Sequence, residues 1–170
     1  MKLDTISMLV ALSILCTGFS AAMLLVWRLL LPMRPLLLWG CAMGCYAIGV
    51  LLIALRDVIH DLLSLPVGNL LLVLCYCLIW VGASVYRNKQ PHYFKILITI
   101  ALFTPLYCWF IWGNPNIAIR TALVRIPMMF LLGGASVTLL RARTKALSPM
   151  EKGVVAAFTL DFCFRLILFL

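Results

Sequence analysis

Ala54-Leu-Arg-Asp-Val-Ile-His-Asp-Leu-Leu-Ser-Leu-Pro-Val-Gly-Asn69 is a short charged stretch between two long apolar runs. It holds two of the five acidic residues of the chain, Asp57 and Asp61. The apolar runs on its two sides are each about 20 residues long, and a helix of that length crosses roughly 30 Å of hydrocarbon. The stretch therefore predicts a polar connection between two membrane-spanning helices.

The composition is that of an integral membrane protein. Hydrophobic residues make up 65% of the chain and charged residues 11%, and the mean hydropathy is +1.15. These values lie far outside the range of soluble domains. Because lipid cannot hydrogen-bond a free backbone, apolar runs of this length must form helices. We expect an all-α, polytopic membrane helical bundle that occupies residues 1–170 as a single domain.

Six apolar runs long enough to span a bilayer follow one another along the chain. We expect spans at about 6–27, 36–55, 67–86, 93–112, 117–140 and 152–170. The first is too long for the apolar core of a signal peptide, and five more follow it. The last run ends at Leu170 without a basic residue or a helix-ending signal, so we expect the natural chain to continue, with a seventh span beyond it.

The basic residues predict the orientation of the spans. Cytoplasmic loops of membrane proteins carry an excess of Lys and Arg. The first, third and fifth connections with their flanks hold Arg28, Arg34, Arg87, Lys89, Lys95, Arg141, Arg143, Lys145 and Lys152. The N-terminus and the even connections hold only Lys2 and Arg56. We therefore expect the N-terminus outside. The formal charge of +9 is explained by this asymmetry, and the basic loops also suit anionic lipid headgroups.

Small residues at a spacing of four mark one face of the second span. Gly40 and Gly44 lie on this face, and such faces let two helices approach closely in lipid. Two interpretations stay open, which are packing inside one bundle and a seam between two copies of the chain. The seven cysteines lie in apolar spans, where reduced thiols behave as small hydrophobes, and we expect no metal site.

The charges inside the late spans are the strongest functional signal. A charge in hydrocarbon costs about 2.5 to 3.5 kcal/mol on insertion scales and therefore faces a partner or a water-filled cavity. Arg120 and Arg165 both belong to the outer half of the bilayer, and Asp161 can pair with Arg165 at the i, i+4 spacing. Arg125 is about 140° round the helix from Arg120, so we expect the two to face different surroundings.

Two interpretations of these charges follow. In one, they form a buried ion network with Asp57 or Asp61 that fixes helix register. In the other, they line an outward-opening polar pocket with surplus positive charge, suited to a carboxylate or phosphate on a small or amphiphilic ligand. The candidate ligand-binding residues are Arg120, Arg165, Asp161, Arg125, Asn69 and Arg56. We expect no catalytic residue, because no nucleophile, base and orienting group stand at a recognisable spacing.

A set of residues spread over the whole chain carries a resemblance to a known family. These residues are Leu3-Asp4-Thr5-Ile6, Trp39, the run Leu51-Leu52-Ile53-Ala54-Leu55-Arg56, Asp61-Leu62-Leu63-Ser64, Gly68-Asn69, Arg120 and Arg165. The chain resembles the N-terminal multi-helix membrane sensor of bacterial GGDEF diguanylate cyclases. The resemblance implies a sensory domain in the bacterial inner membrane, acting as a homodimer.

The output half of such proteins condenses two GTP into cyclic di-GMP. The resemblance implies that GTP and Mg²⁺ belong to that separate domain, and we expect no cofactor in this chain. Its sequence has no Gly-Gly-Asp/Glu-Glu-Phe motif, since its only Gly-Gly pair, Gly133-Gly134, precedes Ala135 inside a span. Two other classes stay open, a small transporter that uses the same charges as a substrate path and a scaffold that only dimerises. We expect no nucleic-acid partner.

Overall fold

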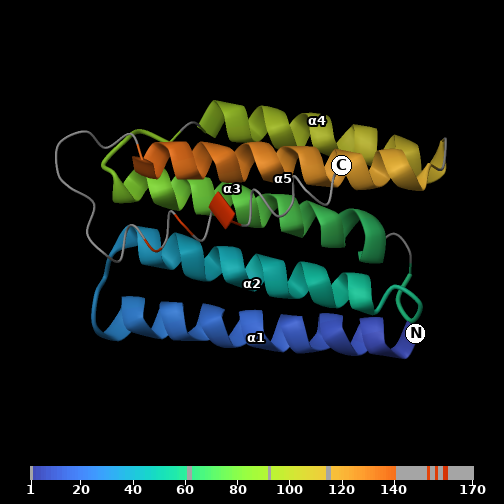
Figure 1. The fold of residues 1–170 in the computed structure, drawn as a ribbon, viewed down its shortest axis with the longest axis horizontal. Helices are drawn as coiled ribbons and strands as arrows, with labels where there is room; N and C mark the ends of the chain where they lie inside the picture. The colour runs from blue at the N-terminus through green and yellow to red at the C-terminus, as the bar shows by residue number, and fades with distance from the viewer. Residues whose placement is uncertain are drawn as a thin grey trace.

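The computed structural model describes residues 2–60, 63–91, 93–113 and 116–140, with single positions at 153, 156, 159 and 160. Over this part of the chain the regular structure is entirely helical (Figure 1). The five long helices are α1 (Lys2–Leu29), α2 (Arg34–Ala54), α3 (Gly68–Tyr86), α4 (Tyr93–Trp112) and α5 (Ile117–Leu140).

The helices pack in chain order except at the end. α1 packs against α2, α2 against α3, and α3 against α5, while α4 packs against α3 and α5. In Figure 1 the row formed by α1, α2 and α3 continues into the pair α4 and α5. The core lies around α3, whose buried residues include Val73, Cys75 and Cys77. α3 is thus the central helix of the bundle.

Within the described residues, four helices are long and apolar enough to cross a membrane, and they run over Thr5–Leu29, Arg34–Ala54, Ser64–Tyr86 and Ile117–Leu140. The segment Ile96–Trp112 of α4 is a shorter apolar helix. A membrane helical bundle is therefore the architecture of the described residues. The predicted sixth span, 152–170, lies outside them apart from the four single positions.

The connection after α2 contains an unusual helical turn. This turn is a π-helix, η1 (Leu63–Val67), which runs directly into α3. Pro66 lies inside this turn, and a proline has no N–H and clashes with the carbonyl four residues earlier, so a wider turn accommodates it. Ser64 is fully buried, so the polar connection that we predicted for this stretch ends earlier than Asn69.

The small-residue face of α2 packs inside the bundle. A Cβ atom on Gly40 would lie 3.0 Å from Leu24 of α1, and one on Gly44 would lie 3.2 Å from the Ser20 hydroxyl. Ser20 Oγ donates a hydrogen bond to the Gly40 carbonyl at 2.8 Å, and Ser13 Oγ donates one to the Ala47 carbonyl at 2.9 Å. Of the two interpretations of this face, the structure shows packing against α1 of the same chain.

Tryptophans join the helices as well as marking their ends. Tryptophans in membrane helices are often interfacial anchors, but Trp80 is only 6% exposed and its indole N–H donates to Thr138 Oγ1 of α5 at 3.1 Å. The Trp39 indole donates to the Ile79 carbonyl at 3.3 Å and lies where a Cβ on Gly82 would be. Glycine is needed at this position because the indole ring occupies the space of a side chain.

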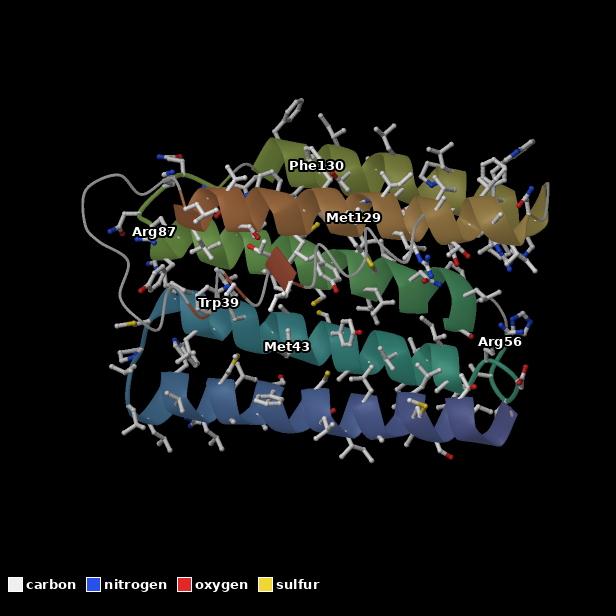
Figure 2. All side chains as sticks on the ribbon, viewed as in Figure 1. Trp39, Met43, Arg56, Arg87, Met129 and Phe130 are labelled. Carbon is white, nitrogen blue, oxygen red and sulfur yellow. The ribbon has the colours of Figure 1, made fainter. Side chains whose placement is uncertain are left out.

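The connections alternate between the two ends of the bundle. The connections after α1 and α3 lie at one end, while the N-terminus and the connections after α2 and α4 lie at the other (Figure 1). Arg87 and Arg56 therefore stand at opposite ends (Figure 2). The Arg87 guanidinium donates to the Leu139 carbonyl at 2.9 Å, which caps the C-terminal end of α5 with a positive charge.

Candidate functional site

A cavity of about 350 Å³ opens at the end of the bundle that carries the N-terminus. It lies between the C-terminal end of α2, the beginnings of α3 and α5, and the last third of α4. The residues Ile53 and Arg56 contribute from the α2 side, Asn69 and Leu72 from α3, and Tyr107 from α4. Its volume is at the lower end of the range found for small-molecule pockets.

α5 provides the longest wall of the cavity. Its lining residues recur at intervals of three and four, so they form one face of the helix. They are Ile117, Arg120, Thr121, Val124, Arg125 and Met128. At a rise of 1.5 Å per residue this face extends for roughly 16 Å from the mouth of the cavity toward the membrane interior. The wall begins at Ile117, continues through polar Arg120 and Thr121, and ends at the buried side chain of Met128.

Arg120 and Arg125 stand on the two edges of this face. At 100° per residue, Ile117, Val124 and Met128 lie near its middle, and each arginine lies about 70° to one side. We expected the angle between the arginines to keep them from facing the same point, and they stand on opposite edges of the face although both line the same cavity. The cavity is wide enough for side chains on both edges of this α5 face to reach it, so the arginines flank an apolar stripe.

Asn69 and Tyr107 form a hydrogen-bonded pair in the cavity wall. The Asn69 amide nitrogen donates to the Leu65 carbonyl and to the Tyr107 hydroxyl, each at 2.8 Å. The Tyr107 ring stacks on Phe103 with centroids 5.1 Å apart and an interplanar angle of 17°. Tyr107 is only 4% exposed. Packing and hydrogen bonding together hold its hydroxyl in one place.

Arg56 is the most exposed charge of the site. Its side chain is 61% exposed and lies 3.6 Å from the carboxylate of Asp57, which is itself 68% exposed. An exposed pair of this kind contributes little to stability. Arg56 also lines a neighbouring cavity of about 290 Å³ against α1, together with Thr5 and Asp57. It therefore forms the rim between two openings.

The charge of the cavity is strongly unbalanced. Three arginines line it, and none of its described lining residues is acidic. Thr121, Asn69 and Tyr107 add uncharged polar groups, while Leu72, Val124 and Met128 supply an apolar interior. Guanidinium groups match the planar oxygens of carboxylates and phosphates through paired N–H donors. The chemistry that fits this lining is an anion with a small apolar part.

The structure brings together four of the six residues proposed from the sequence. Arg120, Arg125, Asn69 and Arg56 line the one cavity. Asp161 and Arg165 lie outside the described residues, as does Asp61. The predicted ion network had Asp57 or Asp61 as its member from the second connection, and the carboxylate of Asp57 lies beside Arg56 at the surface.

Sequence reasoning missed four residues that line the cavity, namely Tyr107, Thr121, Val124 and Met128. A signal for three of them exists, since they continue the three-and-four spacing set by Arg120 and Arg125 along the fifth span. Tyr107 has no such signal, because a tyrosine near the end of a span is typical of an interfacial anchor. Only the contact between α4 and the beginning of α3 shows that it belongs to the cavity.

No family model, curated protein or solved structure matches this chain at a significant level.

Proposed function

We propose that this chain is a membrane-embedded sensory domain that binds a small anionic or amphiphilic ligand in the cavity between α2, α3, α4 and α5. The observation that carries the proposal is the convergence of three arginines on one cavity whose described lining holds no carboxylate. Charges at membrane depth are expensive and face a partner or a cavity. A bound anion would place its negative charge among these arginines.

The lining also favours a ligand with an apolar part. Along α5 the cavity wall passes from Arg120 near its mouth to Met128, a distance of roughly 12 Å. Met128 is 4% exposed, and Leu72 of α3 lines the same cavity. A carboxylate with a short alkyl chain can place its oxygens among the arginines and its chain beside these residues. Butyrate is a suitable soluble probe of this chemistry.

Replacement of Arg125 by glutamine is expected to weaken butyrate binding about tenfold. The substitution keeps a polar side chain of similar reach and removes one of three cavity charges, and a charged hydrogen bond contributes about 1.5 to 3 kcal/mol. Isothermal titration calorimetry on the chain in phosphatidylcholine nanodiscs measures the affinity.

Arg28→Gln is the matched control for this measurement, because Arg28 is exposed near the end of α1 that lies away from the cavity. The control should bind butyrate as the wild type does. Failure of butyrate, inorganic phosphate and an anionic lipid all to bind the wild-type chain would overturn the proposal.

We further propose that the cavity opens to the outside of a bacterial inner membrane. The basic connections after α1 and α3 stand at the opposite end of the bundle, and the excess of basic residues marks the cytoplasmic side. Six spans with the N-terminus outside remain the arrangement that we propose for the whole chain.

A cysteine at Val58 is expected to react with a membrane-impermeant maleimide in intact cells, whereas one at Gln90 should react only after permeabilisation. Both positions are exposed, and they lie in connections at opposite ends of the bundle. The native cysteines are replaced by alanine or serine in the labelling background. Labelling of Gln90→Cys alone in intact cells would reverse the proposed orientation.

The resemblance to the membrane sensors of GGDEF diguanylate cyclases supports a signalling output. We propose that ligand binding changes how α5 packs against its neighbours, and that a cytoplasmic domain responds by altering cyclic di-GMP synthesis. A ligand shifts such an equilibrium only by its differential affinity for the two arrangements. Equal cyclic di-GMP synthesis by the full-length protein with the cavity empty and with it occupied would exclude this output.

A further inference from the structure

The hydrogen bonds of Asn69 fix the orientation of its amide group. The side-chain oxygen and nitrogen of asparagine are distinguished by the partners that they face. A carbonyl oxygen can only accept, so the atom that lies 2.8 Å from the Leu65 carbonyl must be the donating nitrogen. The same nitrogen lies 2.8 Å from the Tyr107 hydroxyl. Both N–H groups of the Asn69 amide are therefore in use.

This arrangement determines the role of the Tyr107 hydroxyl. An amide nitrogen cannot accept a hydrogen bond, so the hydroxyl oxygen accepts from Asn69 and keeps its own proton for another partner. The described residues provide no acceptor for that proton. Buried tyrosine hydroxyls normally find a partner, because a buried donor without an acceptor is destabilising. The proton is thus a donor in the wall of the arginine-lined cavity.

We propose that Tyr107 donates a hydrogen bond to an oxyanion bound in this cavity and that Asn69 is the positioning residue that holds the Tyr107 hydroxyl in its donating role. The inference rests on the function proposed above and extends it to a ligand class, a carboxylate or phosphate oxygen. Arg120 and Arg125 neutralise the charge of the anion, and Tyr107 adds a directional contact from the opposite helix. Asn69, which we had placed among the direct ligand contacts, acts through Tyr107.

The role of the Tyr107 hydroxyl can be tested with a conservative variant, because the ring of Tyr107 stacks on Phe103 without the hydroxyl. Tyr107→Phe removes one oxygen and leaves the ring that packs on Phe103 at 5.1 Å. The affinity for butyrate should fall about 10- to 100-fold, as expected for a hydrogen bond to a charged group. Tyr93→Phe is the matched control, because Tyr93 is 65% exposed at the other end of the same helix. This control should bind as the wild type does.

A double-mutant cycle tests the positioning role of Asn69. Asn69→Leu keeps the size of the side chain and should weaken binding about as much as Tyr107→Phe. In the Tyr107→Phe background the Asn69→Leu change should have little further effect, because the donor that it positions is already absent. A general packing defect would instead lower affinity equally in both backgrounds, and that result would overturn the positioning role.

Two soluble probes and two membranes identify the source of the oxyanion. Titrations with butyrate and with inorganic phosphate are run in nanodiscs of phosphatidylcholine alone and of phosphatidylcholine with an anionic lipid. If the anionic lipid weakens butyrate binding to the wild-type chain but not to Tyr107→Phe, the oxyanion is a headgroup phosphate, and the proposal is supported. Butyrate binding that depends on Tyr107 in both membranes would identify a soluble carboxylate.

The failures of the two proposals are distinguishable. If butyrate or phosphate binds and Arg125→Gln weakens that binding while Tyr107→Phe leaves it unchanged, the role of Tyr107 is excluded and the anion-binding function stands. If neither anion binds the wild-type chain in either membrane, and neither does the anionic lipid, the anion-binding function itself is excluded. Size-exclusion chromatography of each variant confirms that the comparison is made between folded proteins.

Discussion

A Gly49→Leu variant is expected to lose about 3 kcal/mol or more of stability, the upper part of the range for overpacking. A Cβ atom on Gly49 of α2 would lie 2.8 Å from the carbonyl oxygen of Gly68 and 3.3 Å from Leu71 of α3. The carbonyl is part of the backbone and cannot rotate away, so the two helices must separate. Small residues at helix interfaces in membranes allow this close approach.

Gly18→Leu is the matched control for this stability prediction. A Cβ on Gly18 has no atom within 4 Å, and the residue is exposed on α1, so the same substitution there meets open space. Reversible unfolding in mixed micelles of dodecyl maltoside and dodecyl sulfate compares the two variants with the wild type. Equal stability of Gly49→Leu and Gly18→Leu would show that α2 and α3 do not approach as closely as described.

Reversal of charge at Arg120 is expected to reduce butyrate affinity at least 100-fold. Arg120→Glu changes the charge of the cavity by two, and a pair of unit charges 4 Å apart interacts by about 4 kcal/mol near a protein surface. The new carboxylate also stands across the α5 stripe from Arg125 and can take the place of the bound anion. Both effects act in the same direction, so this variant should bind less than any neutral one.

Arg34→Glu provides the control for charge reversal, because Arg34 is exposed at the beginning of α2, at the end of the bundle away from the cavity. Its expected butyrate affinity is that of the wild type, measured by the same titration. Added salt should weaken binding to the wild type far more than to Arg120→Glu, since screening acts on the net charge of the open cavity. Unchanged affinity in Arg120→Glu would remove Arg120 from the binding site.

The sequence predicted the helices closely. The spans expected at 93–112 and 117–140 coincide with α4 and α5, and that expected at 36–55 differs from α2 by only a few residues. Apolar length and turn-forming residues are local properties, so they can be read without knowledge of neighbours. Asn116 is an example of such a local signal. Its side chain accepts a hydrogen bond from the Ile119 N–H at 3.2 Å and caps the start of α5.

The candidate site could be predicted only in part. Arg120 and Arg125 were found because charge within an apolar span is conspicuous in any sequence. Tyr107 was not found, because a tyrosine in a span is equally typical of an interfacial anchor. Its role depends on the amide of Asn69, 38 positions earlier in the chain, and no local pattern connects the two residues.

By itself the sequence determined that this protein is helical, that its helices are apolar enough to cross a membrane, and that arginines stand within them. The tertiary structure decided which faces meet. It directed Gly40 and Gly44 toward α1, and it gathered Arg56, Asn69, Tyr107 and the α5 arginines around one cavity. The physical reason is that helix formation depends on residues three and four positions apart, whereas a cavity depends on side chains brought together from four helices by packing.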